Sequence, residues 1–285
     1  MPPANTLSTW SDASPVYKST VGAVSANAAH ELVSMATTLQ PFASSSRILD
    51  AGCGLGAVTL AVLSQDSDTA IEAIDTSQTM LDGLMANFTK TGLSAPNLNS
   101  KIVDINELLS SYGPNSSFTH IFTSFALHVA TTDFAGRVQD IHTLLPRGGI
   151  FALATFTPHS DVYLIWDRVC RIYDPDYQQA SYALDPRAWS TPGQVAAGLA
   201  KAGFSEIRSV IRRAKFPVQG ADAWVEFWFH GKNPAEEKVV RPFFEKHGDV
   251  SVEDVKETYR RVVRDEWDDG RGVVVEFVLA VGKKG

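Results

Sequence analysis

Apolar residues along the chain form short runs that end at an acidic residue, and these runs alternate with stretches of helical periodicity. The runs before Asp50 and over Thr69–Asp75 predict buried strands. Helical spacing of apolar residues predicts helices over Asn27–Leu39, Ala57–Ser64 and Thr76–Met85. The pattern thus predicts strands that lead through a loop into a helix.

The C-terminal half contains further predicted elements and two segments rich in aromatic residues. Thr191 and Pro192 are suited to the cap and first position of a helix. Phe204–Phe216 reads as a strand, and Gly272–Gly282 as a strand too hydrophobic for a sheet edge. The aromatic segments cover residues 155–190 and 217–271. We expect most of their aromatic side chains to form a core and only some to line a ligand pocket.

A glycine-rich loop follows the first predicted strand. Gly52, Gly54 and Gly56 alternate with other residues directly after Asp50. Glycine permits backbone angles that other residues avoid, and it removes the Cβ atom that would block a ligand from approaching the backbone. The loop therefore predicts a ligand site between strand and helix.

Two acidic residues follow at later strand ends. Asp75 lies nineteen residues after Gly56, and the segment Lys101–Asn106 reads as a further strand that ends at Asp104. An acid about 20 residues beyond such a loop can accept hydrogen bonds from both hydroxyls of a ribose. Helix capping is the alternative for both acids, because carboxylates are also favoured at helix N-termini.

The order D-A-G-C-G-x-G, then Asp75, then Asp104, resembles the class I S-adenosylmethionine-dependent methyltransferases. In this resemblance, Phe118–His128 corresponds to the fourth strand with its exit loop, and Leu144–Ala154 to the turn and fifth strand. The acid at position 104 would hold the adenine amino group, and Ile105 would pack on the ring. The nicotinamide fingerprint G-x-G-x-x-G/A fits less well, since Ala57 would have to serve as its last member.

The resemblance implies an α/β, Rossmann-like fold. Its sheet would have seven strands, mostly parallel, with the last strand antiparallel and inserted between the fifth and sixth. We expect one methyltransferase domain over residues 1–285, with a cofactor-binding core at 44–155. Residues 1–40 would form an N-terminal lid and first helix, and the insertions 156–190 and 217–271 a substrate cap.

The same resemblance assigns roles to individual residues, and no metal ligands are expected. Residues expected to bind the cofactor are Tyr17, Asp50, Gly52, Cys53, Gly54, Gly56, Asp75, Thr76, Met80, Asp104, Ile105, Thr123 and Ser124. Residues expected to bind the substrate are Trp10, Phe125, His128, Phe156, Trp166 and Phe227. His128 is the catalytic candidate, although a structural place at the site wall is the alternative. Cys53 also reads as a small buried filler, and Met80 and Met85 as core residues.

Composition narrows the expected partners. The net charge of −7 and the lack of a basic stripe argue against a nucleic-acid substrate, and the basic run Arg208–Lys215 reads as a solvated face. The sequence shows no apolar run of membrane-spanning length and no signal-peptide pattern. Two cysteines give no disulfide framework, so we expect a cytoplasmic protein without a membrane partner.

The resemblance implies transfer of a methyl group from S-adenosylmethionine to a small molecule with a thiol, hydroxyl or amine nucleophile, such as a secondary metabolite. The size and aromatic cap are similar to fungal secondary-metabolism methyltransferases, including the thiol methyltransferases that act on dithiol diketopiperazines. Two alternatives remain at this point: a nicotinamide-dependent oxidoreductase, and a catalytically silent scaffold with the same fold. The sequence leaves the oligomeric state open.

Overall fold

A computed structural model describes residues 22–93, 95–178, 189–215, 220–229, 239–267 and 272–285. The chain divides into two compact units. The sheet unit comprises described residues within 25–156, 183–212 and 277–285, and the helical unit those within 1–24, 157–182 and 213–276. Trp10 and Tyr17 lie outside the described residues.

The sheet unit is built on one seven-stranded sheet in the order β3-β2-β1-β4-β5-β7-β6. The strands are β1 (Arg47–Ala51), β2 (Ala70–Asp75), β3 (Leu98–Ile102), β4 (His120–Ser124), β5 (Ile150–Phe156), β6 (Phe204–Lys215) and β7 (Val274–Lys284). Strands β1 to β5 pair in parallel, whereas β7 runs antiparallel to β5, with Phe156 opposite Phe277. The expected fold class and the place of the last strand between β5 and β6 are confirmed.

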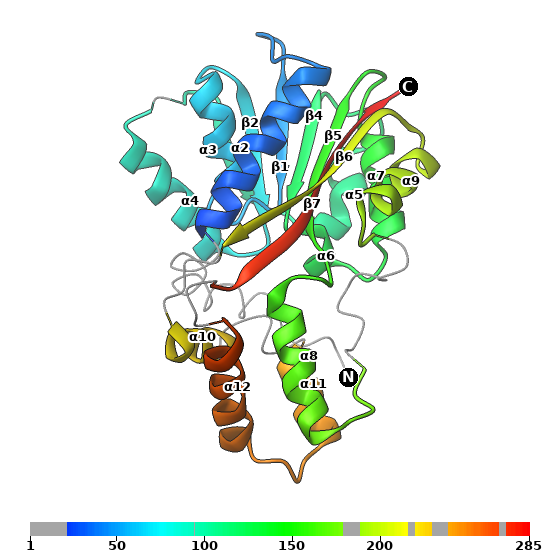
Figure 1. Ribbon diagram of the computed structural model, residues 1–285. Coiled ribbons are helices and arrows are strands. Elements are labelled where there is room, and N and C mark those ends of the chain that lie inside the picture. Colours follow the sequence, from blue (N-terminus) through cyan, green and yellow to red (C-terminus); the bar gives the residue numbers. More distant parts are fainter. Residues whose placement is uncertain (1–21, 94, 179–188, 216–219, 230–238, 268–271) are drawn as a thin grey trace. The chain divides into compact units, whose positions relative to one another are not determined.

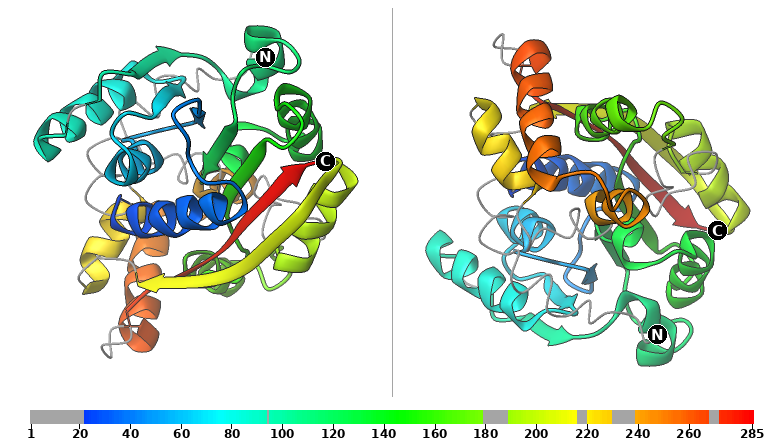
Figure 2. Two further views of the ribbon diagram at one scale, coloured as in Figure 1. Left: turned by 90° about the horizontal axis from the view of Figure 1, so that it is seen from above. Right: turned by 90° about the horizontal axis from the view of Figure 1, so that it is seen from below.

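Helices cover both faces of this sheet (Figures 1 and 2). The helices of the sheet unit are α2 (Gly22–Leu39), α3 (Ala57–Gln65), α4 (Gln78–Thr91), α5 (Leu108–Tyr112), α6 (Leu127–Ala130), α7 (Phe134–Leu144) and α9 (Pro192–Lys201). Apolar residues of α5, α7 and α9 share one core with β1, β5 and β7. Helix α4 packs Leu81 and Leu84 against Ala73 in a separate cluster. Because Ala73 and Ile74 are neighbours on β2 and point to opposite faces, these two clusters lie on opposite sides of the sheet.

The helical unit has its own aromatic core. Its helices are α8 (Asp161–Tyr173), α10 (Gly220–Trp228), α11 (Arg241–Lys246) and α12 (Val252–Trp267). Tyr259 of α12 lies 6.2 Å from Trp166 and from Trp228 between ring centroids, and its hydroxyl accepts a 2.9 Å hydrogen bond from Trp224 Nε1. The indoles and the phenol are fully buried, so these large rings hold the helices together.

A buried carboxylate ties three separate segments of the helical unit. Glu276 accepts hydrogen bonds from Thr157 Oγ1 at 2.9 Å and from Arg213 Nε at 2.8 Å, and its backbone N–H donates to Ser160 Oγ at 2.9 Å. The arginine stays largely exposed while the carboxylate is buried. Buried charges need such partners, so this pairing fixes the start of β7 against the segment after β5.

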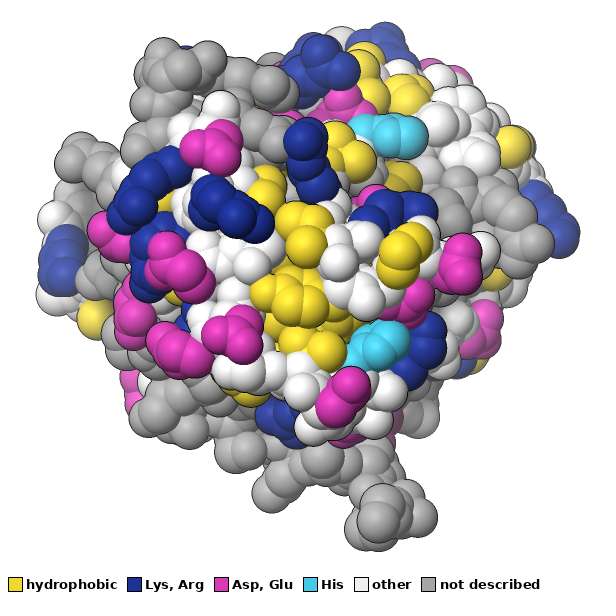
Figure 3. Space-filling view, turned by 60° about the horizontal axis from the view of Figure 1, so that its bottom comes forward, with side chains coloured by type: hydrophobic (Ala, Val, Ile, Leu, Met, Phe, Trp, Pro, Cys, Tyr) yellow, Lys and Arg dark blue, Asp and Glu magenta, His cyan; other side chains and the backbone are white. Residues whose placement is uncertain are grey.

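Some surface features also follow from the helices. On α8, Leu164 and Ile172 are exposed, as is Val252 at the start of α12. Figure 3 shows one face of the molecule, where hydrophobic side chains gather at the centre and charged side chains surround them. Among the described residues, no helix is long and apolar enough to cross a membrane. The basic residues from Arg208 to Lys215 are exposed, as expected.

Two elements differ from the sequence-based expectation. Strand β3 ends at Ile102, so Asp104 lies beyond the strand and caps a short 3-10 helix, η1 (Ile105–Glu107). The strand pairs only with β2 at the sheet edge, and no second neighbour extends it. Met85 was expected in the core but is exposed, because α4 turns this position to solvent while Met80 is buried.

Candidate functional site

The glycine loop after β1 adopts left-handed backbone angles at all three glycines. The φ angles are +74° at Gly52, +52° at Gly54 and +88° at Gly56. A Cβ atom on Gly52 would lie 2.4 Å from Ala126 Cβ, and one on Gly56 would lie 2.1 Å from Leu84 Cδ1. A Cβ atom on Gly54 would meet no protein atom within 4 Å. Two glycines therefore permit close packing, while Gly54 faces open space that a ligand can use.

Asp75 connects this loop to the next helix. Its Oδ2 accepts a 2.9 Å hydrogen bond from the Gly54 N–H, and its Oδ1 accepts a 3.0 Å bond from the Ser77 N–H. Burial raises the pKa of Asp75 above its usual value, although these hydrogen bonds oppose the shift. The side-chain cap of α4 is Ser77, whose hydroxyl accepts from the Met80 N–H. The side-chain cap of α4 is therefore Ser77 and not Asp75. The Asp75 carboxylate instead lies beside the open face of Gly54.

Asp50 is anchored to helix α3. It is buried, and its Oδ2 accepts from both the backbone N–H and the hydroxyl of Thr59, at 3.0 and 2.7 Å. Burial raises the pKa of Asp50 to about 6, which the Thr59 bonds partly offset and the nearby Asp75 charge reinforces. Thr59 was not expected from the sequence. The visible signal for it was a hydroxyl residue two positions inside the helix after the glycine loop.

Cys53 is enclosed between these carboxylates. Burial, with the charges of Asp50 and Asp75, raises the pKa of its thiol well above the ordinary value. The thiol is therefore neutral at physiological pH and unsuited to nucleophilic attack, since the thiolate is the reactive form. Its packing in the α4 cluster agrees with the expected small buried filler.

Asp104 follows β3 and shapes the next turn. Its Oδ1 accepts from the backbone N–H of Asn106 at 2.8 Å and from Asn106 Nδ2 at 2.9 Å. Asp104 therefore caps η1 through Oδ1. Only one of its carboxylate oxygens is used in this way, because no described residue donates to Oδ2. Ile105 is nearly buried beside it.

An aromatic group lies where β4 and β5 end. Phe125 follows β4 with φ +54°, a left-handed angle that costs a residue other than glycine roughly 1–3 kcal/mol. Its ring stacks on Phe156 at 4.4 Å and 19°, and meets Phe277 edge-on at 5.4 Å. The His128 ring lies edge-on to Phe156 at 5.2 Å. The structure thus brings together three predicted substrate-site residues and adds Phe277, which sequence reasoning had missed.

Buried hydroxyl groups accompany these rings. Thr123 and Ser124 end β4, Thr155 lies near the end of β5, and each hydroxyl oxygen is buried without a hydrogen-bond partner among the described residues. Native proteins rarely leave buried polar atoms unpaired, so these hydroxyls are available to hydrogen-bond to water or to a ligand. Thr123 and Ser124, which were predicted to bind the cofactor, are the last two residues of β4.

Other predicted residues lie elsewhere. Trp166 has no exposed surface and packs inside the helical unit, so a substrate would reach it only after rearrangement. Phe227 belongs to α10, and its side chain lies outside the described residues. Thr76 lies between Asp75 and the cap of α4. Among the described residues, no group of three or more His, Cys, Asp or Glu could hold a metal ion.

Comparison with known proteins decides what kind of loop this is. The model of a protein family described as a methyltransferase domain matches residues 48–149, which span β1 through the turn before β5. Residues 48–149 therefore form a methyltransferase domain. The protein is thus an S-adenosylmethionine-dependent methyltransferase, and S-adenosylmethionine is its cofactor. The nicotinamide alternative is set aside by this match.

Solved structures agree on the fold of this methyltransferase. YcgJ from Bacillus subtilis is 18% identical with a TM-score of 0.53, and the alignment covers 90% of this chain and 98% of that chain. A phosphoethanolamine N-methyltransferase from Haemonchus contortus is 15% identical with a TM-score of 0.52, covering 89% and 52%. The [4+2]-cyclase SpnF is 17% identical with a TM-score of 0.52, covering 90% and 80%. Comparison with curated sequences found no match.

Proposed function

We propose that this methyltransferase transfers the methyl group to a small, largely apolar molecule that binds where β4 and β5 end. The aromatic group of Phe125, Phe156, Phe277 and His128 carries this proposal. In open α/β sheets, ligands bind beyond the carboxyl ends of the strands. A small-molecule site combines apolar walls with a few polar groups that fix orientation. The Ser124 hydroxyl supplies such a group here, because Ser124 pairs with Ala154 and therefore lies on the same face of the sheet as Phe156.

The left-handed conformation of Phe125 supports the same assignment. Strained backbone persists only where its surroundings impose it, and such residues concentrate at functional sites. Two aromatic contacts, with Phe156 and Phe277, hold the Phe125 ring in place. A glycine at this position would adopt the angle without strain, so the chain retains the phenyl ring at an energetic cost.

The residues around the glycine loop fit S-adenosylmethionine. Gly54 offers an open face for close approach, Asp75 lies beside it as an acceptor for ribose hydroxyls, and Asp104 retains one oxygen for the adenine amino group. The cofactor supplies an activated methyl group on a sulfonium sulfur. The protein's part is to hold the acceptor in line with that methyl group and to exclude water.

The accepting atom is proposed to be one that needs little help from a protein base. The Asp50 carboxylate already accepts hydrogen bonds from Thr59, and the Asp75 carboxylate accepts them from the backbone of Gly54 and Ser77. Burial keeps the Cys53 thiol neutral by raising its pKa. His128 remains the candidate base in the sheet unit, at the wall formed with Phe156. A thiol, with a pKa near ~8.5, or an amine with a free lone pair suits such a site better than a phenol with a pKa near ~10.

Similar folds serve several acceptors, so the acceptor class must be tested directly. A structure reported for the conversion of a disulfide bond into a thioacetal group in echinomycin biosynthesis is 13% identical with a TM-score of 0.51, covering 89% of this chain and 80% of that chain. Among the solved structures with a similar fold, one is thus connected with sulfur chemistry, and the protein from Haemonchus contortus is an N-methyltransferase. A dithiol diketopiperazine is therefore a reasonable member of the test panel.

The test is methyl transfer from labelled S-adenosylmethionine to an aryl thiol, an aryl amine and a phenol of matched size, with a dithiol diketopiperazine as a fourth acceptor. We expect transfer to the thiol or amine to exceed transfer to the phenol, and Phe156→Ala to raise KM for the acceptor more than KM for the cofactor. Preference for the phenol would contradict the assignment of a weakly assisted nucleophile. Cofactor binding without transfer to any of the four compounds would contradict the proposed acceptor class.

A further inference from the structure

We infer that Asn106 and Arg137 are positioning residues that hold the Asp104 carboxylate in the orientation that selects adenine. This inference rests on the proposed function of Asp104 as the residue that binds the adenine amino group. It goes further by assigning the orientation of that carboxylate to one residue of η1 and one of α7.

The first contact is a pair of hydrogen bonds from Asn106 to one carboxylate oxygen of Asp104. The backbone N–H and the Nδ2 group of Asn106 both donate to Asp104 Oδ1, at 2.8 and 2.9 Å. Because both bonds converge on Oδ1, rotation of the carboxylate would break two hydrogen bonds at once. Oδ2, which receives no bond from a described residue, is therefore held as a fixed acceptor.

The second link joins this turn to the loop after β4. Asn106 Nδ2 also donates to the carbonyl oxygen of Ala130 at 3.0 Å. Ala130 is the last residue of α6, the helix that carries His128. Both hydrogens of the Asn106 amide are then engaged, so the amide connects the proposed adenine turn with the strand end where the methyl acceptor is proposed to bind.

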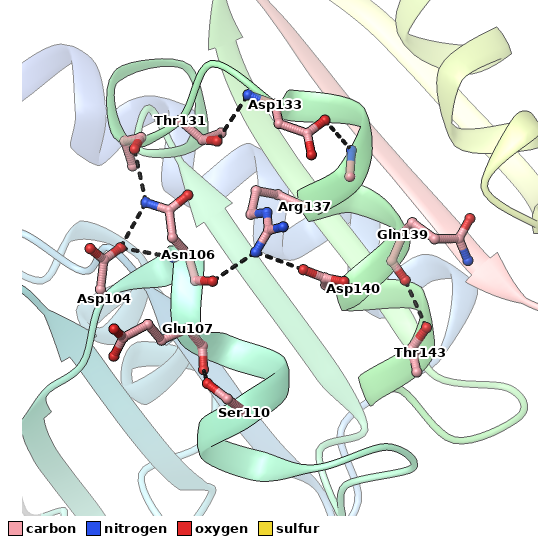
Figure 4. Close-up of polar contacts among 12 residues, drawn as sticks. Asp104, Asn106, Glu107, Ser110, Thr131, Asp133, Arg137, Gln139, Asp140 and Thr143 are labelled. Carbon is pink, nitrogen blue, oxygen red and sulfur yellow. Dashed lines mark hydrogen bonds and ion pairs between the residues drawn. The ribbon is translucent and has the colours of Figure 1, made fainter.

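The third link is Arg137 of α7. Its Nη1 donates to the backbone oxygen of Asn106 at 2.7 Å and lies 2.7 Å from Asp140 Oδ2. Figure 4 shows this chain of contacts, which runs from Asp140 through Arg137 and Asn106 to Asp104. The guanidinium is mostly enclosed, and charge-assisted bonds of this kind are among the stronger hydrogen bonds in proteins. Arg137 therefore holds the backbone of Asn106 in place, and Asn106 in turn donates two hydrogen bonds to Asp104.

A fixed acceptor at Oδ2 has a clear consequence for base recognition. Adenine presents an amino group with two N–H donors, whereas hypoxanthine presents a carbonyl oxygen in its place. A rigid carboxylate oxygen would bond to the first and repel the second. A site built around such a hydrogen bond rejects an analogue that cannot form it, because the buried polar group is then left unpaired.

The test compares S-adenosylhomocysteine with S-inosylhomocysteine, using calorimetric dissociation constants for the wild type and single variants. We expect the wild type to prefer the adenine compound by at least about tenfold, the effect of one good hydrogen bond to a charged group. Asn106→Ala and Arg137→Ala should reduce that preference severalfold. Arg137→Lys should restore part of it, since a lysine ammonium can donate to the same carbonyl oxygen. Arg147→Ala, at an exposed arginine in the same unit, should leave it unchanged.

The outcomes distinguish a failure of the positioning role of Asn106 and Arg137 from a failure of Asp104 as the adenine ligand. Equal binding of both compounds by the wild type would remove Asp104 as the adenine ligand, and the proposed cofactor site would need revision there. A selective wild type, with variants that lose affinity for both compounds in the same ratio, would overturn the positioning role alone. Should Asn106→Ala fail to fold, the ratio measured for the Arg137 pair decides the question.

Discussion

Replacement of Gly54 by alanine separates a ligand-facing glycine from a merely conformational one. Gly54 has φ +52°, and an added Cβ would meet no protein atom within 4 Å. The substitution should therefore lower the free energy of unfolding by roughly 1–2 kcal/mol, which is the cost of placing an alanine in a left-handed conformation. That loss corresponds to a fall in Tm of about 2–4 °C per kcal/mol in a chain of this size.

The structure provides a matched control for this substitution. Gly92, the C-cap of α4, has φ +67° and also has no protein atom within 4 Å of an added Cβ. Gly92→Ala should lose a similar amount of stability. Only Gly54→Ala should weaken binding of S-adenosylhomocysteine, by at least about tenfold, because its methyl group would occupy the open face beside Asp75.

Two measurements decide the result: thermal unfolding without ligand, and titration calorimetry with S-adenosylhomocysteine. Similar Tm shifts with a large difference in affinity would support a cofactor that approaches Gly54. Unchanged affinity for Gly54→Ala would refute the assignment of this face to the cofactor. Equal losses of affinity in both variants would show that the effect is a general consequence of destabilisation.

Three further predictions concern buried groups. Asp75→Ala should weaken S-adenosylhomocysteine binding at least tenfold, since each lost charge-assisted hydrogen bond is worth about 1.5–3 kcal/mol. The affinity is measured by titration calorimetry. Unchanged affinity per folded molecule would mean that Asp75 serves folding alone. Because the pKa of Asp50 is raised to about 6 from 3.8, the folded state binds more protons between these values, and stability falls by about 3 kcal/mol as pH rises through them. Urea unfolding at pH 4 and pH 7 should show that Asp50→Asn gains stability relative to the wild type at the higher pH, and an equal difference at both pH values would argue against the shift. Trp166→Ala should destabilise the protein by about 3–5 kcal/mol in thermal or urea unfolding, and near-native stability with impaired turnover would instead place Trp166 at the substrate.

The sequence determined the parts of the site that depend on local backbone chemistry. Left-handed angles favour glycine, so the loop at Gly52, Gly54 and Gly56 was recognisable from the residues alone. Asp75 was located because β2 is a buried strand with a clear apolar run, and its end is a fixed point in a parallel sheet. Thr191 and Pro192 likewise predicted the start of α9 through local capping chemistry.

Tertiary structure decided the features that depend on distant contacts. Residues 106 and 137 are far apart in sequence, and only the packing of α7 beside η1 brings Arg137 to the Asn106 carbonyl. Phe277 joins Phe125 because β7 pairs antiparallel with β5, a register that no local pattern contains. Aromatic content alone could not tell Trp166, enclosed by other rings of the helical unit, from an aromatic residue at a pocket wall. Burial is a property of the assembled fold, so the sequence predicts which residues can bind a ligand and the tertiary contacts decide which side chains are free to do so.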